Sequence, residues 1–419
     1  MKRFIAGIAM LSIAGPAFAA TPGQVIDHYA DIAEAKYADA LTTAKTLDEK
    51  INDLITSPGP ATLQAAKDAG LAARVPYQQT EVYRFGNAVV DDWEGKVNAW
   101  PLDEGLIDYV DTGSYGAESF ENDLYTANMI ANAVIKVGGR EVSIPEITPA
   151  VLENTLHEAG DIEANVATGY HAIEFLLWGQ DLNGTGAGAG NRPATDFDPS
   201  NCTGGNCERR AQYLAAASAL MLSDLEWMAN AWKDDGDARK ALEAKSETEA
   251  LTTIFTGLGS LSYGELAGER MKLGLLLHDP EEEHDCFADN THNSHFYDQI
   301  GMQNIYTGRY VRVDGSVMEG PSVSVLVRAK DAKADAQTLA ALKATTAAMQ
   351  AMVDRAEAGE AYDQMIGEGN AEGNAIVQAA IDGLIAQTRE FERGIAVLQL
   401  NPIAFEGSDS LDNPSAVQE

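Results

Sequence analysis

Apolar residues recur every three or four positions along most of the chain, which is the period of an amphipathic α-helix. The clearest run is Val377, Ile381, Leu384, Thr388, Phe391, Ile395 and Leu398, whose steps alternate between four and three residues. Such alternation is typical of a seam between packed helices in a bundle. The same kind of pattern predicts helices over residues 29–54, 62–93, 118–137, 148–179, 208–232, 247–277, 322–356 and 377–398. We therefore expect an all-α fold.

Breaks in this periodicity suggest how the helices are grouped. The stretch 183–206 is rich in glycine, contains two prolines and has no apolar period, so we expect a long loop there. Residues 278–322 also look irregular, with a short hairpin around 310–315. We predict two four-helix-bundle-like domains, at 20–190 and 207–419, joined by a loop at 191–206, with the hairpin as a minor element.

Two helical segments resemble each other and suggest an internal duplication. Residues 169–179 and 264–274 share Gly, Ala, Glu and Gly at four of eleven aligned positions. Helices rich in glycine and alanine can reach that level by chance, so both interpretations stay open.

The first nineteen residues have the pattern of a secretory signal peptide. Lys2 and Arg3 form a positive region, residues 4–13 are mostly apolar, and Ala17 and Ala19 supply small residues at the cleavage site. We expect cleavage after Ala19 and export to the periplasm or the outside of the cell. No later stretch of the sequence reaches the ~18 apolar residues that a membrane helix needs.

The chain is strongly acidic, with 29 Lys and Arg against 64 Asp and Glu, a formal net charge of −35. Nucleic acid is therefore not expected as a partner, because phosphate binding requires a basic surface. An anionic membrane surface is disfavoured for the same reason. Metal cations and cationic solutes are the ligands that remain compatible with this negative charge.

Three cysteines in an exported chain raise the question of a disulfide. Cys202 and Cys207 bracket a flexible Thr-Gly-Gly-Asn turn, and we expect them to pair with each other, leaving Cys286 without a role that the sequence reveals. A zinc knuckle would need two further ligands near this pair, and none is present.

One helix of the first half carries a candidate metal site. His171 and Glu174 are three residues apart in an otherwise apolar helix, so their side chains share one face. An imidazole and a carboxylate so placed can ligate iron, manganese or zinc between helices. A buried His–Glu hydrogen bond explains the spacing equally well.

A second cluster of donors lies in the irregular segment 278–295, which holds four of the seven histidines and six carboxylates. Further ligands could come from it, and Glu283, His284, Asp289 and His292 are the candidates. A solvated acidic loop is the alternative interpretation for each of them.

Several catalytic motifs can be excluded. His157-Glu158 does not begin a zinc-peptidase H-E-x-x-H motif, because the fifth position is Asp161. The sequence also contains no G-x-S-x-G elbow, phosphate-binding loop or dinucleotide fingerprint.

The segment G-Y-H-A-I-E-F-L-L-W-G-Q-D, which starts at Gly169, resembles the G-x-H-x-x-E signature of the imelysin-like proteins. Other segments resemble the iron-regulated branch of that family, namely N-A-W-P-L-D-E-G-L-I-D from Asn98, G-N-R-P from Gly190, G-E-R-M from Gly268, E-E-H-D-C-F-A-D-N-T-H from Glu282, and the G-S and G-P-S turns at 315–322. The resemblance spans nearly the whole chain after residue 19.

This resemblance implies an exported protein of two helical bundles, with a site at His171 and Glu174 between them, associated with bacterial iron uptake. The implied cofactor is a divalent metal, iron or zinc, and the implied partners are a metal ion or iron-bearing ligand and an iron-transport component of the cell envelope. The family is also classed with metallopeptidases.

Three functions therefore stay open at this point: a metal-binding protein of iron acquisition, a zinc peptidase and a non-catalytic envelope scaffold. In the peptidase, Glu269 or Glu283 would activate a metal-bound water. Glu269 and its neighbour Arg270 follow a glycine on a helix of the second half and could face His171. Arg270 would then hold a carboxylate ionised, or it would belong to a metal-free His–Glu–Arg network that fixes how the bundles pack.

Overall fold

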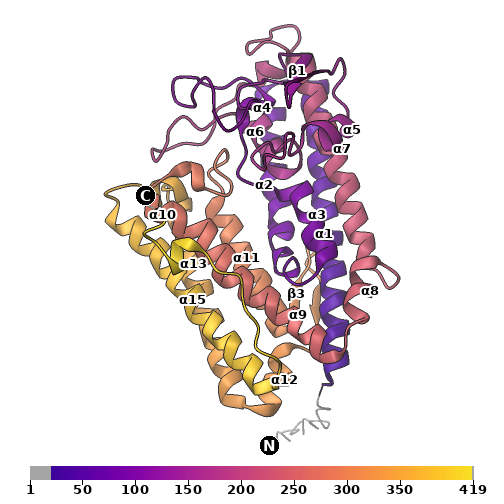
Figure 1. The fold of residues 1–419 in the computed structure, drawn as a ribbon, viewed down its shortest axis with the longest axis vertical. Helices are drawn as coiled ribbons and strands as arrows, with labels where there is room; N and C mark the ends of the chain where they lie inside the picture. Colours follow the sequence, from indigo (N-terminus) through magenta and orange to yellow (C-terminus); the bar gives the residue numbers. More distant parts are fainter. Residues whose placement is uncertain (1–19, 418–419) are drawn as a thin grey trace, which may run out of the picture.

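Long helices make up most of the structure, a computed structural model that describes residues 20–417. They form two bundles that diverge from a common contact region (Figure 1). The predicted signal peptide at 1–19 lies outside the described residues.

The first bundle is built around the longest helix of the chain. Its members are α1 (Pro22–Thr56), α2 (Pro60–Gln78), α3 (Ala88–Asn98), α6 (Gly169–Trp178) and α7 (Cys207–Ala231). Helix α1 starts at a capping box in which Thr21 and Gln24 bond each other's backbone, and it packs along both α2 and α7. Helix α6 packs against α2, α3 and α7, and all ten of its residues are buried.

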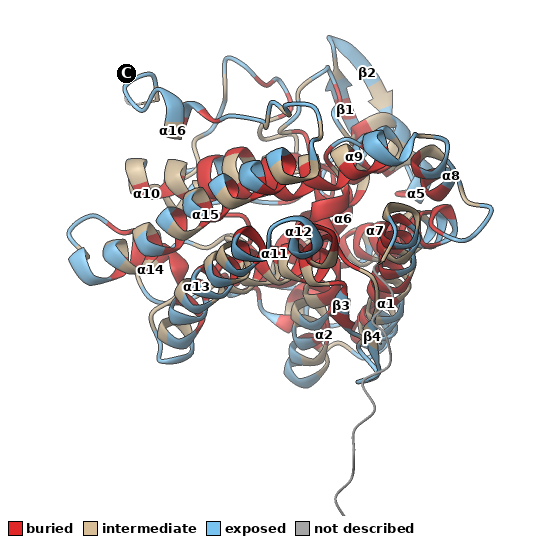
Figure 2. Ribbon diagram, turned by 90° about the horizontal axis from the view of Figure 1, so that it is seen from below, coloured by how far each residue is buried: buried red, intermediate tan, exposed pale blue. Residues whose placement is uncertain are grey.

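The second bundle contains the predicted seam. Its elements are α9 (Glu247–Ser260), the π-helical segment η4 (Leu261–Lys272), α10 (Leu273–Leu277), α11 (Thr291–Thr307), α12 (Val323–Lys330), α13 (Ala332–Glu357) and α15 (Ala371–Leu398). Helix α15 packs against α13 and η4. Six of the seven seam residues are buried, and only Leu398 is partly exposed. Seen from below, the buried residues face one another between these helices (Figure 2).

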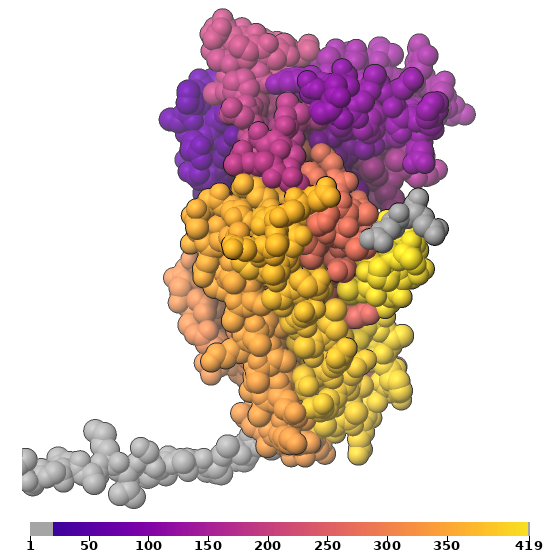
Figure 3. Space-filling view, turned by 90° about the vertical axis from the view of Figure 1, so that its left-hand side faces the viewer, coloured from indigo at the N-terminus to yellow at the C-terminus, as the bar shows by residue number. Residues whose placement is uncertain are grey.

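Helix α11 joins the two bundles. It packs against α2 and the short 3₁₀ helix η1 (Glu81–Tyr83) on one side and against α13 on the other. In the space-filling view, the red-orange middle of the chain lies between the purple first half and the yellow C-terminal part (Figure 3). Residues that line this junction therefore belong to neither bundle alone.

Helix α7 packs with the helices of the first bundle. The predicted helix 208–232 exists as α7, but its buried face, which includes Tyr213, Leu214 and Met221, packs on the first bundle. The chain passes to the second bundle only around the short helix α8 (Asp237–Glu243), which precedes α9. Periodicity predicted the helix but could not assign its packing partner.

Three predicted helices of the first half are wrong in extent. Residues 118–137 form turns that end in a strand, β1 (Val134–Val137), paired with β2 (Arg140–Ser143). The predicted helix 148–179 is interrupted after α5 (Pro149–Val151) and η2 (Leu152–Leu156), where Glu158, Gly160 and Asp161 have positive φ angles. The predicted helix 62–93 is divided into α2, η1 and α3.

The segment predicted to be irregular contains α11, which was not expected. The minor hairpin was expected and is confirmed, with β3 (Arg309–Val311) antiparallel to β4 (Val317–Glu319) and Tyr310 opposite Met318. The remaining short helices are α4 (Glu104–Ile107), η3 (Ala194–Phe197), η5 (Pro280–Glu282), α14 (Tyr362–Ile366) and α16 (Asp409–Asp412). The internal duplication stays a prediction.

A search of the described residues finds no helix with the length and apolar character needed to cross a membrane.

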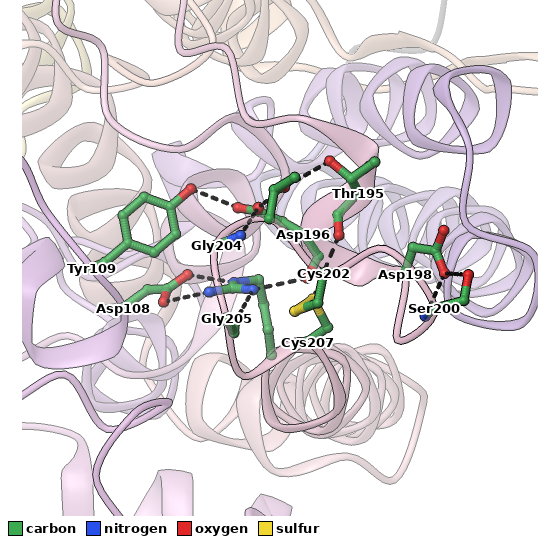
Figure 4. The surroundings of a disulfide bond; sticks show 12 residues. Asp108, Tyr109, Thr195, Asp196, Asp198, Ser200, Cys202, Gly204, Gly205 and Cys207 are labelled. Atoms are coloured by element: carbon green, nitrogen blue, oxygen red, sulfur yellow. Dashed lines mark hydrogen bonds and ion pairs between the residues drawn. A yellow bond between two sulfur atoms is a disulfide. The ribbon is translucent and has the colours of Figure 1, made fainter.

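A disulfide lies where α7 begins. Cys202 and Cys207 are bonded, with their Cα atoms 6.0 Å apart, and Cys286 is free. Beside it, Arg210 donates to both carboxylate oxygens of Asp108, at 2.6 and 2.9 Å, and Tyr109 donates to Asp196 at 2.6 Å (Figure 4). These bonds connect α7 and η3 to the segment that follows α4.

Gly169 determines where α6 begins. Its φ angle is +77°, and a Cβ atom at this position would collide with the backbone of Val97 at the end of α3. We expect Gly169→Ala to lower the free energy of unfolding by about 2–4 kcal/mol, because both the backbone strain and the clash must be absorbed. Urea denaturation of the variant measures this, with Gly95→Ala as the control, since space around Gly95 is open. A loss below about 1 kcal/mol at Gly169 would contradict the packing described.

Candidate metal centre between the bundles

His171 and Glu174 lie in the first turns of α6 and face the junction of the two bundles. His171 Nδ1 is 3.1 Å from Glu174 Oε2, and the two residues are 1% and 8% exposed. The other carboxylate oxygen, Oε1, accepts a hydrogen bond of 2.9 Å from the backbone N–H of Ala288. The three-residue spacing thus places both side chains on one face, as the helical period requires.

The loop before α11 brings two more donors to this face. The ring of His284 lies edge-on to that of His171, with centroids 4.7 Å apart. Asp285 Oδ1 is 3.7 Å from His171 Nδ1. His171, His284 and Asp285 are all buried, and one ligand atom from each lies within 4.8 Å of the others. A single ion could contact all three.

Arg74 of α2 and Asn98 of α3 hold this cluster in place. Arg74 Nη2 is 2.8 Å from Asp285 Oδ1, and its Nη1 donates to Asn98 Oδ1 at 2.6 Å. The amide nitrogen of Asn98 lies 3.5 Å from His284 Nε2. The second oxygen of Asp285 accepts bonds from Ser294 and Asn290. Asp285 is therefore fixed by groups from both bundles.

Arg270 of η4 approaches the cluster from the second bundle. Its Nη2 is 2.7 Å from Glu81 and 2.8 Å from Glu265, and its Nη1 is 3.2 Å from Asp298. The same Nη1 is 3.5 Å from His284 Nε2. Arg270 thus pairs mainly with carboxylates and touches the histidine pair only at its edge. It joins η1, η4 and α11.

Burial keeps both histidines neutral. It lowers the pKa of His171 to about 3, and the nearby Arg74 contributes in the same direction. Burial, with Arg270 second, also lowers the pKa of His284 well below its ordinary value. Burial raises the pKa of Glu174 well above its ordinary value, and the carboxylate of Asp285 adds to this. Burial alone would raise the pKa of Asp285, but the Arg74 guanidinium, together with hydrogen bonds from Ser294 and Asn290, lowers that pKa.

Unpaired atoms in this cluster suit a metal ion. Among the described residues, no hydrogen-bond partner exists for His171 Nε2 or His284 Nδ1. Buried polar atoms without partners are costly, and neutral imidazole is the form that binds metals. A dication would also favour the ionised form of Glu174. Two imidazoles with two carboxylates match the preferences of iron or zinc.

A cavity of about 410 Å³ leads to the two histidines. His171 and His284 line it together with Trp100, whose indole donates to the backbone oxygen of Glu283 at 2.7 Å. Its acidic lining residues are Asp103, Glu104, Asp181 and Glu281, and no Lys or Arg of the described chain lines it. Burial raises the pKa of Glu104 to about 8, so the negative charge of this lining comes from the other three acids, and it favours cations over anions.

Comparison with known proteins identifies the family. The family model for imelysin matches residues 33–391, which is most of the chain. The chain belongs to the imelysin family.

Two relatives of this imelysin-family chain carry the name iron-regulated protein A. Iron-regulated protein A of Synechococcus elongatus is 32% identical over 104 residues, a match that covers 24% of this chain and 29% of that relative. A crystal structure provisionally named as an iron-regulated protein A precursor, from Parabacteroides distasonis, superposes with a TM-score of 0.60 at 17% identity. That superposition covers 90% of this chain and 97% of the other. It shows that the two share a fold.

The structure does not bring all the predicted ligands of this imelysin-family chain together. His284 joins His171 and Glu174 in the cluster. Glu283 and Asp289 are nearby in sequence but belong to a separate group of carboxylates. His292 is buried in the first turn of α11, where its Nε2 lies 3.1 Å from the amide of Asn293.

Glu269 does not reach the cluster. Its side chain is exposed, whereas those of Gly268 and Arg270 on either side are buried, so Glu269 faces solvent from the opposite side of η4. The carboxylate that η4 contributes to the junction is Glu265. Neither acid that the sequence suggested as a peptidase base therefore contacts His171 in the structure.

Sequence analysis missed Asp285, Arg74 and Asn98. Asp285 follows His284 directly in the E-E-H-D segment, so its place beside a candidate ligand was the available signal. Arg74 lies in an alanine-rich helix and has no such signal, because its partner is far away in the sequence.

The junction should give the protein a measurable pH dependence through Glu94 of α3. Glu94 accepts a bond from Asn98 at 3.1 Å, and burial, with Glu81 second, raises its pKa to about 7. The folded state therefore keeps a proton that the unfolded state loses between pH 4.5 and 7, and stability falls as the pH rises through this window. We expect Glu94→Gln to match the wild type near pH 5 and to be more stable by about 2 kcal/mol at pH 8. Urea denaturation at both pH values measures the free energy of unfolding of the variant and the wild type. If the two proteins differ by the same amount at pH 5 and at pH 8, the prediction is wrong.

Proposed function

We propose that this imelysin-family protein binds one divalent first-row metal ion, iron or zinc, through His171, His284, Asp285 and Glu174. The observation that carries the proposal is the pair of buried neutral imidazoles, each with an unpaired nitrogen, beside a fixed carboxylate. In a core without a metal ion, such buried unpaired atoms would lower the free energy of unfolding, and no interaction would compensate for that loss.

We further propose that the protein serves iron acquisition in the cell envelope, with an iron-transport component as its partner. The predicted signal peptide, the acidic entrance to the cluster and the similarity to proteins named as iron-regulated support this assignment. The acidic lining favours a hydrated cation over an anionic chelate as the form in which metal enters.

Peptidase activity is less well supported by the geometry. Among the described residues, the cluster contains two carboxylates and both already have partners, since Asp285 is paired with Arg74 and Glu174 accepts from Ala288. A general base must reach the water that it activates. Glu174 is the acid that would have to act if the protein is a peptidase.

Metal analysis and a cleavage assay on the same preparation test this function. The chain without its first 19 residues is dialysed against Zn²⁺ or, without oxygen, Fe²⁺, and then assayed with an unstructured peptide. We expect one tightly bound ion per chain at neutral pH and no metal-dependent cleavage. Cleavage that requires the bound ion would show instead that the protein is a metallopeptidase. If neither metal binding nor cleavage is observed, the result supports the non-catalytic scaffold.

A further inference from the structure

A second group of carboxylates lies beyond the histidine cluster. Asp181 follows α6, Asp289 precedes α11, and Asp363 lies in α14, so three separate parts of the chain contribute one residue each. One carboxylate oxygen from each of the three lies within 4.8 Å of the others. Nothing in the sequence pattern indicates this arrangement, because the residues are far apart along the chain.

Asp363 is the residue that makes this group more than an acidic surface. It is 1% exposed, and neither of its carboxylate oxygens has a hydrogen-bond partner among the described residues. Asp289 Oδ1 is likewise buried without a partner. Burying an ionised carboxylate is unfavourable unless a hydrogen bond, a cation or a metal compensates.

No basic side chain supplies that compensation. Within residues 20–417, no Lys, Arg or His forms an ion pair with Asp181, Asp289 or Asp363. Glu283, also 1% exposed and with both carboxylate oxygens unpaired, adds to the negative charge. Burial, and then the neighbouring Asp363, raise the pKa of Asp289 to about 7, as expected for carboxylates that repel one another.

We propose that Asp181, Asp289 and Asp363 form a second cation site, distinct from the histidine cluster, which binds a hard divalent cation of the Ca²⁺ type. All three donors are carboxylate oxygens, with no nitrogen or sulfur, which is the donor set of Ca²⁺, Mg²⁺ and Mn²⁺. Ca²⁺ fits best, because it accepts irregular geometry and bidentate carboxylates, and both oxygens of Asp363 are free. The nearby Glu283 carboxylate adds to the negative charge around this site.

A cation at this site would join the two bundles next to the metal centre. Asp181 belongs to the loop that follows α6, and Asp363 belongs to the second bundle. Asp289 is in the same short loop as His284 and Asp285, and its neighbour Ala288 donates to Glu174. Ca²⁺ would therefore hold the loop that carries two of the proposed ligands of the first centre.

Calorimetric titration of the chelator-treated chain with CaCl₂, with melting temperatures measured in parallel, tests the site. We expect one Ca²⁺ per chain and a higher melting temperature with Ca²⁺ than with chelator. Asp363→Asn and Asp181→Asn should each weaken Ca²⁺ binding at least tenfold. In chelator, Asp363→Asn should be no less stable than the wild type, because it removes one of three repelling charges.

Matched variants separate this site from the histidine cluster. Asp27→Asn, on an exposed position of α1, should bind Ca²⁺ like the wild type. His171→Ala should also keep Ca²⁺ binding, so a failure of the first centre leaves this result unaffected. The proposal is overturned if Ca²⁺, Mg²⁺ and Mn²⁺ all fail to bind, or if both Asp181→Asn and Asp363→Asn bind Ca²⁺ as the wild type does.

Discussion

Replacing His284 with alanine is expected to lower the affinity for iron or zinc at least 100-fold. His284 is one of two neutral imidazoles in the cluster, and the structure leaves its Nδ1 without a partner. Loss of groups that only orient a metal ligand already weakens binding about 10- to 100-fold, and loss of a ligand should cost no less. Equilibrium dialysis of the variant with Zn²⁺ and with Fe²⁺ measures the effect.

The His284→Ala experiment also separates a metal centre from a purely structural network. If His284 is a ligand, the metal-free variant should melt close to the metal-free wild type, and only the gain in melting temperature with metal should disappear. His28→Ala is the matched control, since His28 bonds the backbone oxygen of Gly308 and takes no part in the cluster. A variant that melts lower than the wild type by the same amount with and without metal would support the structural network instead.

Replacing Arg270 with methionine is expected to lower the free energy of unfolding by about 3–5 kcal/mol. Arg270 pairs with Glu81, Glu265 and Asp298, of which Glu81 and Asp298 are almost fully buried. Removing one partner of a buried ion pair leaves charges that neither water nor protein compensates, and this is the costly way to break such a pair. The effect should exceed that of the Glu94 and Gly169 substitutions.

Urea denaturation at pH 7.5 measures the Arg270→Met effect. Arg328→Met, at an exposed position of α12 without an ion pair in the described chain, should stay within about 0.5 kcal/mol of the wild type. An Arg270→Met variant less than 1 kcal/mol below the wild type would show that the carboxylates at the junction find other partners.

The helices that the sequence predicted well are those with one apolar face. Helices α1, α7 and α15 each bury a single stripe against a bundle, so a period of three to four residues is visible in their sequences. Helix α11 was missed because it is buried on several sides at the junction, and it buries polar residues such as His295, Asp298 and Gln299. Without an exposed polar face, no period marks it.

The false helix at 118–137 has a different cause. Its asparagines bond the backbone locally, where Asn122 accepts from the N–H of Leu124 and Asn128 from that of Ala131. Such side-chain bonds compete with helical hydrogen bonds and favour turns. The spacing of apolar residues alone does not reveal this competition.

The candidate site was predictable only where its residues are neighbours in sequence. The spacing of His171 and Glu174 places them on one face of any helix, and the donor-rich segment around His284 stood out by composition. The pairing of Arg74 with Asp285 and the separation of Asp289 into another group depend on how the bundles dock. No local pattern contains that information.

Anomalous X-ray scattering from crystals soaked in Fe²⁺ or Zn²⁺ tests the proposed metal centre most directly. We predict one strong peak about 2.0–2.2 Å from a ring nitrogen of His171 and a ring nitrogen of His284, with a carboxylate oxygen of Asp285 or Glu174 completing the contacts. Crystals that bind these metals elsewhere, with no peak between the two histidines, would contradict it.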